Sequence, residues 1–178
     1  MIKLKQYVVP LTFVVDIQSW NHGLHSNAEK DWVCFDNARN DPAFKNRYSQ
    51  SYAIDVLKIC KDGNGDYNFF FIEFKDLTKV GSATLFFIKK RDNLIMKLIE
   101  SIAITSYFLG SSRYVGVKDF LLSKKRRYYI VYNGGNKLHS HLAAIVFLKG
   151  IRLSGHVSRV DVMEWSVFCK IISPTCCK

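Results

Sequence analysis

The sequence has no apolar run long enough to cross a membrane. Its longest apolar stretches are interrupted by charge well before about 18 residues, the length that a membrane helix needs. The start of the chain also lacks a positively charged segment followed by an apolar one, which a secretory signal would show. Neither secretion nor membrane association is supported, and we expect a cytoplasmic protein.

Paired cysteines are missing as well. None of the five cysteines stands in a CxxC pair, and an odd number leaves at least one thiol unpaired. Free thiols fit a reducing compartment. The closing "TCCK" does not form the C-a-a-X pattern of prenylation, because Cys176 is third from the end.

Motifs of several common enzyme classes are absent. No G-x-x-x-x-G-K-[ST] element occurs, which disfavours a kinase or P-loop ATPase, and the glycines at 63–65 and 133–135 are typical of turns. No nucleophile-elbow motif is present, although a Ser or Cys nucleophile stays open. His139 and His141 have no cysteine or carboxylate beside them at zinc-ligand spacing, so a zinc site is disfavoured.

The chain is long enough for one substantial core and short for two, with 178 residues of which 48% are hydrophobic. We expect a single domain over residues 1–178. The pattern predicts apolar β-type segments broken by Pro10, a helix from Ser26 or Asn27, strands over 51–60 and 67–76, a helix over 89–110, a strand over 126–133, a helix over 137–150 and a last strand over 157–172. This order predicts an α/β (α+β) fold, with a central mixed β-sheet flanked by helices.

Acidic residues are scarce in the second part of the chain. Residues 1–80 hold 10 Lys/Arg and 10 Asp/Glu, whereas residues 81–178 hold 16 and 5, so the whole net charge of +11 arises there. An excess of this size favours a polyanion such as nucleic acid as the partner, with a merely solvated basic surface as the alternative. The densest clusters, which we predict to contact nucleic acid, are Lys89, Lys90 and Arg91, and Lys124, Lys125, Arg126 and Arg127.

Ionisable residues interrupt two apolar runs in the stretch "SYAIDVLKICKDGNGDYNFFFIEFKDL". If the runs pair antiparallel about Asn64, at the centre of the polar turn, Leu57 lies opposite Phe71 and Asp55 lies opposite Glu73. Lys75 then shares a face with Glu73, because side chains alternate along a strand. Two carboxylates become cross-strand neighbours.

Like charges in this position repel and need neutralisation. A divalent cation such as Mg²⁺ or Mn²⁺ prefers carboxylate and water oxygens and is often held by a pair of acids. Lys75 is placed to orient an attacking water or to stabilise charge developing on a phosphate. The alternative is an ordinary ion network on a solvent-facing side of the sheet.

The pattern D-(17 residues)-E-x-K, followed by a long amphipathic helix, resembles the PD-(D/E)xK nuclease superfamily, whose fold is restriction-endonuclease-like. The resemblance covers about residues 52–132 and implies a core over about 51–133. It implies that Asp55 and Glu73 bind the metal and that Lys75 serves the attacking water. The sequence departs from the pattern at Ile54, where the family often has proline.

The resemblance also implies two further positions. Family members often carry an acid on a helix before the first core strand, for which Glu29 is the candidate metal ligand, with Asp36 behind it. They can carry a polar residue on the helix after E-x-K, for which Lys97 or Glu100 would serve.

Together these observations predict a metal-dependent endonuclease that hydrolyses phosphodiester bonds, with DNA favoured over RNA. Two alternatives stay open at this point. One is a nucleic-acid-binding module with a nuclease-like fold and no catalysis, and the other is a nuclease toxin neutralised by an acidic inhibitor protein. Symmetric cutting of a duplex would favour a homodimer.

Overall fold

The computed structural model describes residues 8–9, 32–35, 53–61, 64–110, 120–134 and 155–175. Within these ranges, six strands form one sheet in the order β1-β2-β3-β4-β5-β6. The strands are β1 (Val8–Val9), β2 (Trp32–Cys34), β3 (Val56–Lys61), β4 (Tyr67–Asp76), β5 (Arg126–Asn133) and β6 (Arg159–Glu164). The helices are α4 (Ala83–Gly110), the short 3₁₀ helix η4 (Ser123–Lys125) and α7 (Trp165–Thr175).

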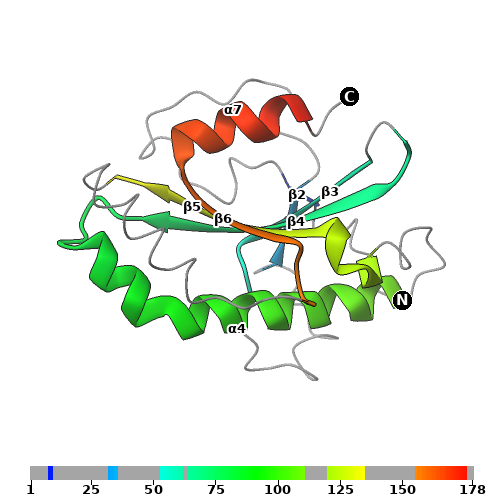
Figure 1. Ribbon diagram of the computed structural model, residues 1–178, viewed down its shortest axis with the longest axis horizontal. Coiled ribbons are helices and arrows are strands. Elements are labelled where there is room, and N and C mark those ends of the chain that lie inside the picture. Colours follow the sequence, from blue (N-terminus) through cyan, green and yellow to red (C-terminus); the bar gives the residue numbers. More distant parts are fainter. Residues whose placement is uncertain are drawn as a thin grey trace.

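The sheet is mixed. Strands β1 to β4 pair antiparallel, whereas β4 with β5 and β5 with β6 pair parallel. A parallel pair needs a crossover connection, and α4 supplies it between β4 and β5. Helix α4 covers one face of the sheet and α7 covers the other (Figure 1). This arrangement confirms the predicted α/β fold, a mixed sheet flanked by helices.

Burial on both faces explains the nearly continuous apolar run of β4. Phe69 and Phe71 join the core cluster on the α4 side, and Phe70, Ile72 and Phe74 join the cluster on the α7 side. The rings of Trp165 and Phe168 in α7 each lie 5.8 Å from the ring of Phe74. Odd-numbered side chains of β4 therefore point toward α4.

The hairpin has the predicted register. Leu57 pairs with Phe71 and Val56 pairs with Ile72, which centres the turn on Asn64. Gly65 in this turn has a φ of 83°, a left-handed conformation that suits glycine. The first strand is shorter than predicted, because β3 begins at Val56, one residue after Asp55.

Helix α4 begins earlier than the sequence pattern predicts. The pattern predicts the helix from residue 89, but the helix starts at Ala83. Ser82 caps it, since its hydroxyl accepts from the amide of Leu85 (3.3 Å) and its carbonyl accepts from the amide of Phe86 (3.0 Å). The end at Gly110 agrees with the prediction. In the described part of the chain, no helix combines the length and the apolarity needed to cross a bilayer.

Two other segments differ from the prediction. Residues 157–172 are predicted as one strand, but β6 ends at Glu164 and α7 follows, with Trp165 and Phe168 buried one helical turn apart. The helix predicted from Ser26 or Asn27 is wrong at 32–34, where β2 pairs with β3. Pairing with a neighbouring strand determines the secondary structure of this short segment, and the local sequence pattern does not show that pairing. The helix predicted over 137–150 lies outside the described residues.

Gly134 follows the end of β5 and packs against Thr78, which follows the end of β4. Replacing Gly134 by Ala should destabilise the protein by about 3 kcal/mol. Its φ is 79°, and an added Cβ would lie 2.5 Å from the Thr78 side chain and 2.8 Å from the Thr78 backbone. Gly65→Ala is the control, because its φ is similar but nothing lies within 4 Å, so strain alone should cost about 1 kcal/mol. Urea unfolding of both variants measures the difference, and equal losses would contradict the steric account.

Candidate active site

Glu73 is a buried carboxylate in the middle of a strand. Its side chain has an exposed fraction of 0% and points toward α4, on the same face of β4 as Phe69 and Phe71. Oε1 accepts hydrogen bonds from the ammonium groups of Lys75 and Lys97, the latter at 2.6 Å. Oε2 is buried and has no hydrogen-bond partner among the described residues.

Asp55 lies beside Glu73, as the predicted register requires. Its Oδ2 accepts a hydrogen bond of 2.6 Å from the amide of Phe74, the residue after Glu73. Its backbone carbonyl accepts from the amide of Phe35 at 3.1 Å. The amide of Ile54 donates to the Ser101 hydroxyl of α4 at 2.9 Å. Strand β4, the end of β2 and helix α4 together hold Asp55 in place.

The pKa of Asp55 is raised to about 6. Burial is the largest cause, because it disfavours the charged form, and the negative charge of Glu73 adds to it. Lys75, the Phe74 amide and Lys97 oppose the rise. Burial and the like-charge repulsion predicted from the sequence together leave a carboxyl group that titrates near pH 6.

Tyr128 lies in β5 beside β4 and belongs to the core cluster on the α4 side of the sheet. Its hydroxyl donates to the carbonyl of Leu94 in α4 at 3.1 Å, and its side chain is fully buried. Burial raises its pKa well above the ordinary value, and the charges of Glu73 and Asp55 raise it further. The acids thus border an apolar interior, in which charges interact more strongly than in water.

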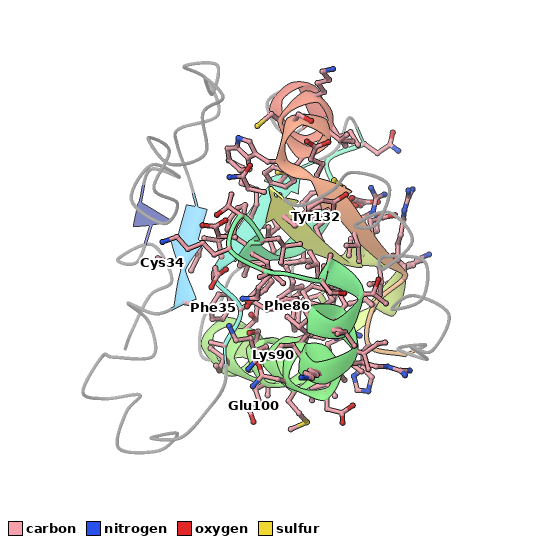
Figure 2. All side chains as sticks on the ribbon, turned by 90° about the vertical axis from the view of Figure 1, so that its left-hand side faces the viewer. Cys34, Phe35, Phe86, Lys90, Glu100 and Tyr132 are labelled. Atoms are coloured by element: carbon pink, nitrogen blue, oxygen red, sulfur yellow. The ribbon has the colours of Figure 1, made fainter. Side chains whose placement is uncertain are left out.

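Lys97 is the charged contribution of α4 to this cluster. The resemblance left Lys97 and Glu100 as alternatives on this helix, and the structure places Lys97 on Glu73. Its side chain is 21% exposed and that of Lys75 is 22%, so both ammonium groups reach Glu73 from the solvent side. Figure 2 shows Lys90 and Glu100 along the same helix, with Phe35 buried between the helix and the sheet.

Buried polar residues on α4 were not anticipated. Ser101 and Thr105 have exposed fractions of 0%, and the Thr105 hydroxyl donates to the carbonyl of Ser101 at 2.7 Å. The sequence could have indicated the burial of Ser101, because Ser101 lies two helical turns after Leu94 and so shares the buried face of the helix. Glu29 and Asp36, the candidates for a further acid, lie outside the described residues.

The predicted nucleic-acid-binding cations occupy several places. Lys89 and Lys90 are exposed on α4, and Arg91 beside them is partly buried. In η4, Lys124 is exposed, whereas Lys125 forms an ion pair with Asp66 at 2.9 Å. The exposed lysines therefore place positive charge on the surface of two separate elements, α4 and η4.

The two arginines that open β5 lie on opposite faces of the sheet. The guanidinium of Arg127 lies 5.6 Å from the ring centre of Phe70. Arg126 is only 7% exposed, lies 5.3 Å from the ring centre of Phe120, and donates to the carbonyl of Gly155 at 3.0 Å. Arg126 is predicted to contact phosphate, and this packing leaves little of its side chain at the surface.

In the described ranges, no group of three or more His, Cys, Asp or Glu residues gathers in a way that could hold a metal ion. The carboxylate pair of Asp55 and Glu73 is the arrangement that the sequence predicts. Comparison with protein-family models, with curated proteins and with solved structures finds no match to this chain.

Proposed function

We propose that this protein is a divalent-metal-dependent nuclease in which Asp55 and Glu73 hold Mg²⁺ or Mn²⁺ and Lys75 serves the attacking water. The observation that carries the proposal is the buried oxygen Oε2 of Glu73, which has no hydrogen-bond partner among the described residues and lies in a strand next to a second acid. The resemblance of the D-(17 residues)-E-x-K pattern supports the same assignment.

The residues present fit such a cation. A buried polar atom without a partner is costly, and a carboxylate oxygen is the ligand type that Mg²⁺ and Mn²⁺ prefer. Mg²⁺ is commonly bound by one or two carboxylates and keeps several waters. Burial and, after it, the charge of Glu73 raise the pKa of Asp55, and a nearby cation would offset both effects by favouring the ionised form.

Each protein group has a role in this proposal. A divalent cation supplies positive charge that makes water more acidic and stabilises charge developing on a phosphate. Lys75 lies two residues from Glu73 on the same face and orients the attacking water or offsets negative charge on the phosphate. Lys89, Lys90 and Lys124 attract the nucleic-acid backbone, and DNA is favoured over RNA on the resemblance.

A second candidate is a nucleic-acid-binding module without catalysis. The two lysines on Oε1 favour it, because they neutralise Glu73 without any metal. An acidic inhibitor protein on the basic second part of the chain would give a third role, that of a toxin, with the same chemistry.

A cleavage assay separates these candidates. Supercoiled plasmid, linear duplex, single-stranded DNA and RNA are each incubated with the protein and Mg²⁺, Mn²⁺ or EDTA. We expect cleavage with Mg²⁺ or Mn²⁺ and none with EDTA. Glu73→Gln should abolish it while keeping the shape of the side chain. Asp92→Asn, which removes an exposed carboxylate of α4, should cleave like the natural protein. Binding of nucleic acid without cleavage under every condition would favour the non-catalytic module.

A further inference from the structure

The charges at the site balance before any metal binds. Two carboxylates, Asp55 and Glu73, face two ammonium groups, Lys75 and Lys97. Both lysines contact the same oxygen of Glu73, and its other oxygen has no hydrogen-bond partner among the described residues. The acids are therefore already neutralised on one side, and a cation entering at the other side meets two like charges nearby.

We propose that Lys97 competes with the metal in the free protein and turns to a substrate phosphate when metal binds, so that metal and nucleic acid bind cooperatively. This inference rests on the proposed function. A divalent cation would leave the site with two excess positive charges, and a phosphodiester group brings one negative charge. A bound phosphate group therefore reduces the repulsion between the metal ion and the two ammonium groups.

The position of Lys97 suits this exchange better than that of Lys75. Lys75 belongs to the same strand as Glu73, two positions away, so the strand holds the two side by side. Lys97 reaches Glu73 from the helical layer, 24 positions along the chain, on a flexible stem whose side chain is 21% exposed. Lys90 lies two turns earlier on the same side of α4 and is exposed, so an outward turn of Lys97 extends a row of cations.

Cooperativity of this kind is reciprocal. If nucleic acid raises the affinity for metal by a given factor, metal raises the affinity for nucleic acid by the same factor. Removing the ammonium group of Lys97 should tighten metal binding in the absence of nucleic acid. It should also reduce the factor by which nucleic acid raises the metal affinity. A lysine that only stabilises the fold would do neither.

Calorimetric titration of Mn²⁺ tests the inference. Each protein is titrated alone and with a short phosphorothioate DNA duplex, which keeps its charge and resists hydrolysis. For the natural protein we expect the duplex to tighten Mn²⁺ binding by about tenfold or more. Lys97→Met should bind Mn²⁺ about tenfold more tightly without the duplex and lose most of the coupling. Lys97→Gln, which keeps a polar end, should behave likewise.

Lys170→Met is the matched control, because it removes an exposed lysine of α7 on the other side of the sheet and should leave both affinities unchanged. Equal Mn²⁺ affinity with and without duplex in the natural protein would overturn the inference, as would unchanged binding in both Lys97 variants. In those cases Mn²⁺ still binds and metal-dependent cleavage persists, so the proposed function stands. Absence of Mn²⁺ binding and of cleavage in all proteins would overturn both.

Discussion

Asp55→Asn is expected to stabilise the folded protein by roughly 3 kcal/mol at pH 8 in the absence of divalent metal. The folded-state pKa of about 6 lies above the ordinary value of 3.8, so the folded protein binds the Asp55 proton more tightly than the unfolded chain does. Stability of the natural protein should therefore fall as pH rises from about 4 to about 6, and stay lower above that range. Asparagine does not titrate and still offers an oxygen to the Phe74 amide.

Urea unfolding between pH 4 and pH 8 measures this effect. The difference between Asp55→Asn and the natural protein should vanish near pH 4 and reach its full size above pH 7. Asp92→Asn, at an exposed position of α4, should follow the natural protein throughout. Parallel curves for Asp55→Asn and the natural protein at every pH would contradict the raised pKa.

The same variant tests the metal assignment. Mn²⁺ should raise the melting temperature of the natural protein, more at pH 8 than at pH 5, because metal binding requires ionised carboxylates. Asp55→Asn should lose most of that rise. A rise that survives the substitution would place the metal elsewhere.

Lys75→Met is expected to slow DNA cleavage by about 10²- to 10⁴-fold with little change in DNA affinity. The Lys75 ammonium group forms an ion pair with the buried Glu73, and the Lys75 side chain is partly exposed. An attacking water would approach the site from this exposed side. Methionine keeps most of the stem, so the variant removes the charge and its hydrogen bonds more than the packing.

Single-turnover cleavage and fluorescence anisotropy of labelled duplex separate the two properties. Lys170→Met should leave both unchanged, because Lys170 lies on α7, across the sheet from the acids. If Lys75→Met weakens binding as much as cleavage, Lys75 is a docking residue and has no special part in the chemistry.

The hairpin and β5 could be predicted closely because their signals are local. The turn around Asn64 sets the pairing of Leu57 with Phe71, and the arginines and the asparagine that bound "RRYYIVYN" mark both ends of β5. The start of α4 was missed because its first turns contain Phe86 and Phe87, which also suit a strand. The boundary between β6 and α7 was missed because apolar residues continue across it.

The site could be predicted in part. Alternation along β4 places Glu73 and Lys75 on one face, and the turn brings Asp55 beside them. Which helix residue joins them depends on how α4 packs on the sheet, so Lys97 could be named only as one of two. The burial of Arg126 had no sequence signal either, because a cluster of cations does not show which member packs inside.

The four charged residues of the site lie between Asp55 and Lys97, in the hairpin and in α4, whereas most of the basic excess lies farther along the chain. Strand β5 flanks Glu73 through its apolar residue Ile130, so it shapes the site without adding charge to it. Mutation can therefore act on the exposed cations after α4 without altering the acids. In evolution, the cationic surface and the carboxylate pair can change separately.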